Sequence, residues 1–316
     1  MPLDVKELRM YYDTPVGELK AVDSVSFKLN KGEALGIAGE SGCGKSSLGL
    51  TIMRLLPPNG RILGGAVRLN GENLLEKTEK EMRTVRWKRL SMVFQGAMNA
   101  LTPVLRVGDQ IAEAIRAHEN MGKEEARRQS RKMLSLVGLE EARAESYPHE
   151  LSGGMRQRAM IAMALACNPE LLIADEPTTA LDVVVQAQVL DLLRDLRAKL
   201  GLSLMLISHD VSIVAQVCDL MAVMYAGNFV EYSDTREIFQ NPLHPYTRRL
   251  MAAVPSVKGG RTRLTSILGL PPDLANLPAG CRFNERCVVA EEMCKTEEPV
   301  LTEVRKKHFV ACHLVK

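Results

Sequence analysis

The stretch that decides the fold reads Gly39-Glu40-Ser41-Gly42-Cys43-Gly44-Lys45-Ser46. It fits the pattern G-x-x-x-x-G-K-[ST] of the phosphate-binding loop of nucleotide hydrolases. The apolar run over residues 33–38 precedes it and predicts a buried parallel strand. After it, apolar residues recur at helical spacing as far as Leu56, and Pro57 stops the helix. Strand, glycine-rich turn and helix start predict an anion site, because backbone N–H groups and the helix dipole converge there.

The residues of this loop have different expected roles. The glycines let the backbone approach the phosphates, Lys45 reaches the β- and γ-phosphates, and the Ser46 hydroxyl binds Mg²⁺. Cys43 is interpreted as a small filler residue. The predicted nucleotide-binding residues of the loop and the following turn are Gly39, Ser41, Gly42, Cys43, Gly44, Lys45, Ser46 and Ser47.

Composition bounds the class of protein. A chain of 316 residues can hold two domains, at roughly 150 residues each. The 46% hydrophobic and 25% charged content is typical of a soluble globular protein, and a net charge of +3 is too small to indicate nucleic acid. No apolar run approaches the length of a membrane span, and the N-terminus lacks a signal peptide. We therefore expect membrane contact only through partner proteins.

Strands and helices alternate along most of the chain. Alternating patterns predict strands at 8–12, 21–29 and 65–71, and helical periodicity covers 107–137 and 183–200. Buried strands are predicted at 90–95, 171–176 and 202–207, each followed or ended by polar residues. This order predicts a wound α/β sheet, in which ligands lie outside the carboxyl ends of the strands. One site can therefore collect Lys45, Gln95, Asp175, Glu176 and His209.

Phosphoryl transfer to water needs charge neutralisation, a divalent ion and a positioned water. Asp175 suits a carboxylate that holds Mg²⁺, and Glu176 suits a general base or water-orienting group. Gln95 can reach both Mg²⁺ and the attacking water, and His209 can donate to the γ-phosphate. We therefore assign Glu176, His209 and Gln95 as candidate catalytic residues.

The segment Leu151-Ser152-Gly153-Gly154-Met155-Arg156-Gln157-Arg158 resembles the signature motif of ABC ATPases. As that family requires, it lies between the phosphate-binding loop, or Walker A motif, and the Walker B motif that ends in Asp175. Gln95 resembles the Q-loop, Asp182 lies in a match to the D-loop, and His209 matches the switch histidine. Tyr12 stands where the adenine-stacking aromatic is found, with Tyr11 a close rival. The resemblance covers roughly residues 5–235. It implies ATP as the nucleotide.

The same resemblance implies a fold and an assembly. The fold is an ABC-type P-loop NTPase over residues 1–235, with a RecA-like core, an antiparallel β subdomain and a helical subdomain at about 97–165. Two cassettes sandwich two ATPs, and Ser152, Gly153 and Gly154 of one close over phosphates held by the other. The residues support this, because Ser152-Gly153-Gly154 precedes a helical run and offers a second helix N-terminus to an anion.

After Tyr232 the composition changes to a proline-punctuated sequence with little helical or strand periodicity, which places a domain boundary near residue 235. Residues 236–316, called the C-terminal segment here, resemble the C-terminal extension of oligopeptide/dipeptide-type ABC importer ATPases. The resemblance rests on Asn241-Pro242-Leu243-His244-Pro245-Tyr246-Thr247 and on a Cys-rich end.

Four cysteines cluster in this segment with the spacing C-x₅-C-x₆-C-x₁₇-C: Cys281, Cys287, Cys294 and Cys312. Four thiolates suit an iron–sulfur cluster or zinc, although zinc sites usually use tighter pairs. Related importer ATPases hold a [4Fe–4S] cluster at matching cysteines, so the resemblance favours that cluster, with zinc or unliganded cysteines as alternatives. His308 and His313 are interpreted as bystanders. We expect a structural role for the metal, because the segment has few large apolar residues.

The resemblance implies an ATPase that energises import of di- or oligopeptides, or of a related solute such as an oligosaccharide or nickel. The implied partners are a second cassette, two transmembrane permease subunits and an extracytoplasmic solute-binding protein, with no nucleic acid. The expected location is peripheral, at the cytoplasmic face of the cell membrane.

Two other functions were weighed. A non-transport ABC ATPase acting on DNA or ribosomes is disfavoured, because 107 residues without a heptad tract separate Lys45 from Ser152 and the chain holds one cassette. The nearly neutral charge points the same way. A degenerate regulatory cassette is disfavoured because every catalytic position is filled.

Overall fold

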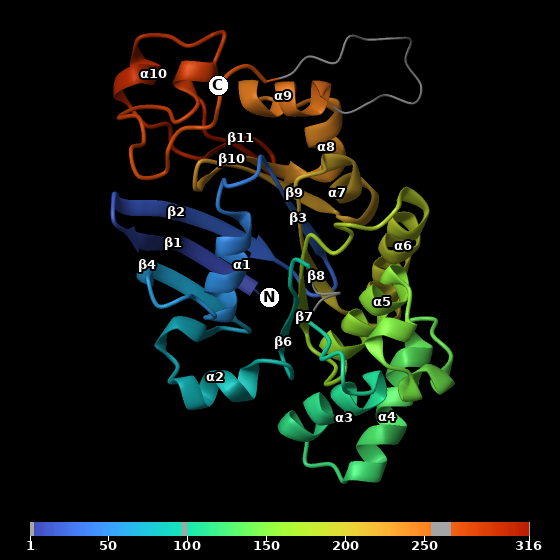
Figure 1. Cartoon of the computed structure of the whole chain (residues 1–316). Helices are drawn as coiled ribbons and strands as arrows, with labels where there is room; N and C mark the ends of the chain where they lie inside the picture. Colours follow the sequence, from blue (N-terminus) through green and yellow to red (C-terminus); the bar gives the residue numbers. More distant parts are fainter. Residues whose placement is uncertain (1–2, 97–99, 254–266, 316) are drawn as a thin grey trace.

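The computed structural model describes residues 3–96, 100–253 and 267–315 (Figure 1). The predicted start of the helical subdomain, residue 97, lies outside these ranges. Two sheets organise the described chain: one of eight strands in the order β11-β12-β10-β9-β3-β8-β7-β6, and one of four in the order β2-β1-β4-β5.

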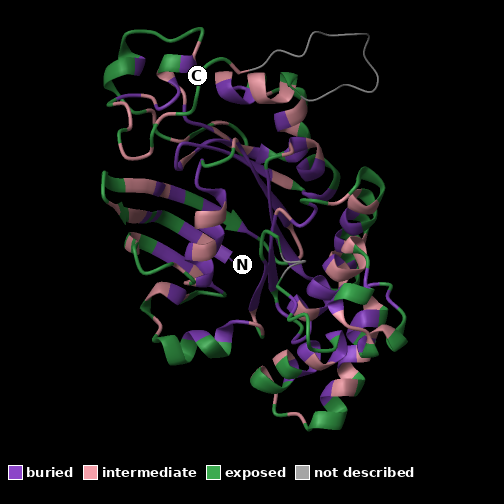
Figure 2. Ribbon diagram, in the orientation of Figure 1, coloured by how far each residue is buried: buried purple, intermediate pink, exposed green. Residues whose placement is uncertain are grey.

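The centre of the eight-stranded sheet is parallel, from β9 to β6. These five strands are β3 (Ala34–Ala38), β6 (Leu90–Val93), β7 (Leu171–Asp175), β8 (Ser203–Ser208) and β9 (Leu220–Tyr225). Their residues are almost all buried, which explains why the sequence shows continuous apolar runs rather than alternation (Figure 2). The predicted wound α/β sheet is confirmed.

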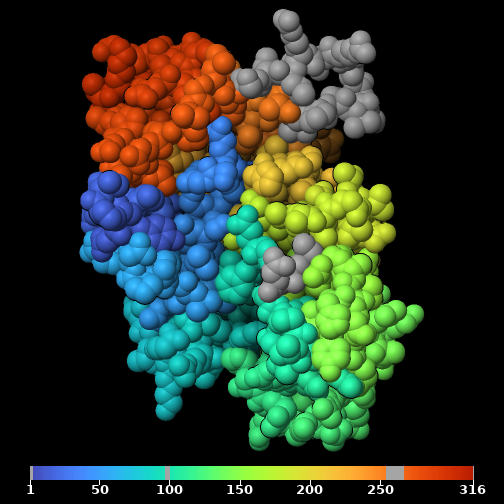
Figure 3. Space-filling model, in the orientation of Figure 1, coloured from blue at the N-terminus to red at the C-terminus, as the bar shows by residue number. Residues whose placement is uncertain are grey.

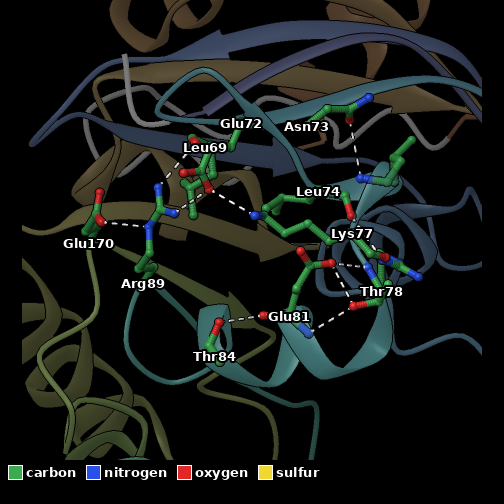
Figure 4. A network of polar contacts seen from close by, with 12 residues as sticks. Leu69, Glu72, Asn73, Leu74, Lys77, Thr78, Glu81, Thr84, Arg89 and Glu170 are labelled. Carbon is green, nitrogen blue, oxygen red and sulfur yellow. Dashed lines mark hydrogen bonds and ion pairs between the residues drawn. The ribbon is translucent and has the colours of Figure 1, made fainter.

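The smaller sheet is antiparallel, and its register runs from Leu3 opposite Leu29 to Thr14 opposite Gly17. Its strands are β1 (Leu3–Thr14), β2 (Gly17–Leu29), β4 (Gly60–Leu69) and β5 (Glu72–Asn73). An ion-pair network links it to the large sheet: Arg89 lies 2.8 Å from Glu72 and 3.1 Å from Glu170 (Figure 4). The antiparallel subdomain predicted by the family resemblance is therefore present.

The helices are α1 (Lys45–Met53), α2 (Glu79–Val85), α3 (Val107–His118), α4 (Lys123–Leu136), α5 (Gly153–Ala164), α6 (Val183–Leu200), α7 (Val211–Val217), α8 (Thr235–Gln240), α9 (Pro245–Ala252) and α10 (Met293–Thr296). Short 3₁₀ turns occur at Leu74–Glu76, Glu141–Glu145, Pro148–Glu150 and Asn284–Arg286. The helices α3 and α4 lie at one end of the molecule, and α5 lies further in, in contact with both of them and with α6 and β6 (Figure 1).

Helix α1 ends earlier than the sequence predicted. The prediction extended it to Leu56, but Arg54 adopts a left-handed conformation with φ of 52° and terminates the helix at Met53. The Arg86 side chain caps this end by donating to the carbonyl oxygens of Met53 and Arg54, both at 2.9 Å. Leu55 is therefore exposed rather than part of a buried helical stripe.

The segment after Tyr232 forms regular structure although its sequence shows little helical or strand periodicity. Strand β10 (Asn228–Asp234) continues past Tyr232, and the helices α8 and α9 follow it. Strand β12 (His308–Val310) then pairs antiparallel with β10, and β11 (Thr302–Arg305) pairs with β12. The elements are short, from three to eight residues, and several of their buried residues pack against the chain before residue 235, so no long repeat of apolar residues develops. Whether residue 235 separates two independently folding domains stays a prediction.

The C-terminal segment shares a core with the rest of the chain instead of building its own. Phe283 and Tyr246 are fully buried, and their ring centroids lie 5.4 Å apart. Both rings contact Tyr225, the last residue of β9, with centroid distances of 5.3 Å and 4.7 Å. This aromatic cluster anchors the segment at the carboxyl end of the parallel strands.

Replacing Phe283 with alanine is expected to lower the free energy of unfolding by about 3–4 kcal/mol, because it leaves a cavity among buried rings. Urea denaturation followed by circular dichroism measures this loss. Val300→Ala is the control in the same segment, since Val300 is 75% exposed and its replacement should cost less than about 0.5 kcal/mol. Equal costs for the two variants would contradict the shared core.

Candidate functional site

The loop after β3 is held tightly against neighbouring backbone. Gly39 has φ of 156°, and an added Cβ would lie 2.2 Å from the carbonyl oxygen of Met224. Gly44 has φ of 107°, and an added Cβ would lie 1.9 Å from the carbonyl oxygen of Ala21. Both positions therefore require glycine, since any side chain would clash with backbone that cannot move independently. Gly44 is also the N-cap of α1, with no side-chain cap.

Lys45 and Ser46, the first two residues of α1, lie inside this loop. The Lys45 ammonium is buried and donates to the carbonyl oxygens of Gly39 and Glu40, both at 2.8 Å. The Ser46 hydroxyl donates to Asp175 Oδ1 at 3.1 Å, which joins the loop to the end of β7. A cation, a helix N-terminus and two oxygen ligands thus converge in one place.

Glu176 is the centre of the polar contacts at this edge. Its Oε2 accepts hydrogen bonds from Gln95 and Thr179, both at 2.9 Å, and its Oε1 lies 2.9 Å from His209 Nδ1. The residue adopts a left-handed conformation with φ of 46°, and its backbone N–H donates to the Ile207 carbonyl. Such strain is typical of functional positions held by their surroundings.

The two adjacent carboxyl groups have opposite pKa shifts. Burial raises the pKa of Asp175, and the nearby charge of Glu176 adds to this, although the Ser46 hydrogen bond opposes it. Burial also raises the pKa of Glu176, but hydrogen bonds from His209 and Thr179 outweigh it, so its net pKa is lowered. The Glu176 carboxylate therefore stays ionised to a lower pH than an ordinary glutamate, because its pKa is lowered.

The structure separates the two candidate tyrosines. Tyr12 directs its hydroxyl to Ser47 Oγ, at 3.1 Å, and so lies beside the first turn of α1. Tyr11 points elsewhere, donating to Asp23 Oδ1 at 2.8 Å with the Lys20 ammonium 5.8 Å from its ring centroid. This geometry favours Tyr12 as the residue beside a nucleotide, and its role stays a prediction.

Two of the remaining predicted nucleotide-binding residues, Ser152 and Asp182, are N-caps of other helices. Ser152 is exposed and accepts from the Met155 N–H at 3.3 Å, as the N-cap of α5. Asp182 is exposed and accepts from the Val185 N–H at 3.0 Å, as the N-cap of α6. No hydrogen bond found among the described residues joins either of them to the loop of Lys45. Gly154 contacts α6, since an added Cβ would lie 2.5 Å from Val185 Cγ1.

Sequence reasoning missed two sets of contacts. The contact of Thr179 with Glu176 was not predicted. Its signal in the sequence is a hydroxyl side chain three residues after Glu176, close enough to bond back to the carboxylate. The contacts of the C-terminal segment with the loop were also missed: Tyr246 accepts from the Glu40 N–H at 3.1 Å, and Arg286 pairs with the Glu40 carboxylate. No sequence signal relates Glu40 to Arg286.

The four clustered cysteines lie in one neighbourhood. Burial raises the pKa of the Cys281 thiol to about 11, and the three other cysteines add to the shift. No group of three or more His, Cys, Asp or Glu side chains in the described ranges, which include all four cysteines, is arranged to hold a metal ion. The two histidines bind elsewhere: His308 lies 2.7 Å from Glu231, and His313 lies 2.9 Å from the Glu297 carbonyl.

The fold and this site define the chain as an ABC transporter ATPase. The family model described as ABC transporter matches residues 22–179, and the model described as oligopeptide/dipeptide transporter, C-terminal region, matches residues 230–294. The chain belongs to the family of ATP-binding subunits of oligopeptide- and dipeptide-type ABC transporters.

Relatives support this assignment along the whole chain. The probable peptide ABC transporter ATP-binding protein y4tR of Sinorhizobium fredii is 49% identical, over 98% of this chain and 94% of its own length. The oligopeptide transport ATP-binding protein OppD of Escherichia coli is 48% identical, over 98% and 92%. The dipeptide transport ATP-binding protein DppD of Bacillus subtilis is 46% identical, over 99% and 94%.

Solved structures agree with the fold. The cassette MJ0796, described as a bacterial ABC transporter cassette with a dimeric structure, is 28% identical with a TM-score of 0.66. The match covers 74% of this chain and 99% of that one. A second structure of the same cassette is described as dimeric, in a post-hydrolysis state, bound to ADP and Pi. None of the helices in the described part of the chain is long and apolar enough to cross a membrane.

Thr179→Val is expected to raise the pKa of Glu176, because it removes a hydrogen bond to the ionised carboxylate while burial remains. The acid limb of the pH profile of ATP hydrolysis should then move to higher pH. Thr302→Val, on the exposed part of β11, is the matched control and should leave the profile in place. An acid limb that does not move in Thr179→Val would show that ionised Glu176 is not required for hydrolysis.

Proposed function

We propose that this chain is the ATP-hydrolysing subunit of an importer of di- or oligopeptides. The observation that carries the proposal is the position of Glu176, which contacts Gln95 and His209 at the same edge of the sheet as the Lys45 loop. The hydrogen bond from Ser46 to Asp175 connects that loop to the residue before Glu176. The relatives are peptide, oligopeptide and dipeptide transport proteins, which supports a peptide cargo; a related solute such as an oligosaccharide or nickel is the alternative.

The loop supplies the phosphate site. The N–H groups at the start of α1 and the Lys45 ammonium bind the phosphates of ATP. The ammonium then donates to phosphate oxygens in place of the carbonyl oxygens of Gly39 and Glu40. Ser46 and Asp175 fit Mg²⁺, because both present oxygen ligands within 3.1 Å of each other. Mg²⁺ when bound neutralises charge on the transferring phosphoryl group. Tyr12 stacks on the adenine.

Glu176 orients the attacking water and accepts its proton. A carboxylate with a lowered pKa is a weak base, so orientation is the larger part of its role. His209 is 60% exposed at its side chain, which leaves it free to turn from Glu176 toward the γ-phosphate. Gln95 is exposed beside the same carboxylate, where its amide would contact both Mg²⁺ and the attacking water.

A second cassette completes the site. At the start of α5, exposed Ser152 and partly exposed Gly153 and Gly154 form a helix N-terminus that does not contact this chain's own Lys45 loop. In a dimer it closes over phosphates held by the partner, with Asp182 at the same boundary. ATP then links the cassettes and hydrolysis releases them, which gives two states with different affinities. The dimeric description of a similar cassette supports this arrangement.

The other partners follow from the family. Two transmembrane permeases carry the cassettes at the cytoplasmic face of the membrane, and an extracytoplasmic binding protein delivers the solute. The chain contacts the membrane only through the permeases and does not bind nucleic acid. The cassette does not touch the cargo, so its residues do not select the peptide.

Glu176→Gln is expected to lower steady-state ATP hydrolysis by about 10²–10⁴-fold while ATP still binds, so that a nucleotide-bound dimer accumulates. Phosphate release and gel filtration with ATP measure the two effects. Glu113→Gln, on the exposed face of α3, is the matched control and should change neither. Unchanged hydrolysis in Glu176→Gln would remove Glu176 from the mechanism.

Cys281, Cys287, Cys294 and Cys312 hold a [4Fe–4S] cluster as a structural staple in this proposal. The support is the all-thiol donor set and the shared neighbourhood of the four side chains. Zinc is the less favoured ligand, because zinc sites usually use cysteine pairs spaced more closely than these. The 65-residue family match to this region ends at Cys294 and does not address a cluster.

Anaerobically purified protein is expected to contain about four irons and four sulfides per chain, as a Cys₄-held cluster requires. Cys287→Ser should lose most of this iron, whereas Cys167→Ser, a buried cysteine outside the cluster, should keep it. Iron analysis and visible absorption measure both. Colourless protein with stoichiometric zinc would reject the cluster.

A further inference from the structure

An acidic residue stands in the loop assigned to phosphate binding. Glu40 follows Gly39 directly, and its carbonyl oxygen accepts a hydrogen bond from the Lys45 ammonium at 2.8 Å. Its side chain is 25% exposed. An unneutralised carboxylate here would repel the phosphates that the loop is built to attract, because like charges at short range in a partly buried site interact strongly.

Arg286 of the C-terminal segment neutralises this carboxylate. Its two terminal nitrogens lie 2.7 Å and 2.9 Å from the two oxygens of Glu40, which is a bidentate pair. The Arg286 side chain is only 4% exposed, so solvent screens the pair much less than it screens an ordinary surface ion pair.

The surroundings fix Arg286 in this position. Its Nε donates to the Leu268 carbonyl at 3.0 Å, and one terminal nitrogen donates to the Tyr225 hydroxyl at 3.2 Å. The guanidinium lies 5.7 Å from the centroid of the Tyr225 ring. Tyr246 holds the same loop residue from the backbone side by accepting the Glu40 N–H. Two residues of the C-terminal segment thus hold both the charge and the backbone of Glu40.

The C-terminal segment as a whole adjoins the N-terminal part of the chain. Figure 3 shows the orange and red C-terminal surface lying directly against the blue N-terminal part of the chain. Arg282 reinforces this junction, since it lies 2.6 Å from Asp23 and donates to the Ala226 carbonyl at 2.7 Å.

We propose that Arg286 is a positioning residue for ATP binding: by pairing with Glu40 it removes a repulsive charge from the phosphate-binding loop. The C-terminal segment thereby sets the affinity of the loop for ATP. This inference rests on the assignment of the Lys45 loop as the ATP site.

The test is a double-mutant cycle with equilibrium binding of Mg-ATP to the full chain. Arg286→Gln should raise the Kd about tenfold, because it leaves the carboxylate unneutralised near the phosphates. In that background, Glu40→Gln should restore most of the affinity. The same replacement in the unaltered chain should change the Kd much less, because Arg286 already neutralises Glu40 there. The deficit of Arg286→Gln should also shrink as the salt concentration rises.

A purely structural role for Arg286 predicts different results. The double variant would then bind no better than Arg286→Gln, and added salt would not help; either result, or an unchanged Kd in Arg286→Gln, overturns the proposal. Arg305→Gln is the matched control: it breaks an exposed pair with Glu237 at 3.6 Å in the same segment and should leave the Kd unchanged. Thermal melting establishes that each variant is folded.

One further variant separates this inference from the assignment of the site. Lys45→Ala should abolish Mg-ATP binding. If Lys45→Ala still binds, the assignment of the ATP site fails; if it does not bind while the Arg286 variants behave as unaltered protein, only the proposed role of Arg286 fails.

Discussion

The site depends on one constraint: parallel strands bring their carboxyl ends to the same edge of a sheet. β8 lies between β3 and β7 and is hydrogen-bonded to both, so Ala38 lies opposite Ser208 and Asp175 lies opposite Ile207. The residues that follow these strands are therefore neighbours, although they lie far apart in the chain. The Lys45 loop, Asp175, Glu176 and His209 share one edge of the sheet because each lies at or just beyond the carboxyl end of one of these strands.

This constraint explains which features the sequence predicts well. Buried parallel strands are continuous apolar runs, so 33–38, 171–176 and 202–207 were located from composition, and the polar residues beyond them were assigned to one site. The end of a helix is harder to predict from sequence when a side chain distant in the chain caps it. Arg86 caps α1 from 32 residues beyond Arg54, and nothing in the local sequence reveals it. Thr179 was missed because its role follows from the strained turn at Glu176.

The C-terminal segment was the hardest part to predict, for a physical reason. Its buried residues contact the preceding domain, so they show no period of their own: Phe283 meets Tyr225, and His308 reaches the buried Glu231 at 2.7 Å. The family resemblance assigned the segment to a class. The pairing between Arg286 and Glu40 joins residues 246 positions apart in the sequence and is visible only in three dimensions.

The pairing of β12 with β10 has a consequence for the integrity of the protein. Without β12, β10 would present a row of unpaired backbone groups at the border of the large sheet, and such borders recruit strands from other chains. The short hairpin of β11 and β12 covers that border, and β11 becomes the outermost strand of the sheet. β11 has only four residues, which are mostly exposed and include charged side chains. The C-terminal hairpin thus covers an edge that could otherwise accept a strand from another molecule, and removing the hairpin would expose that edge of β10.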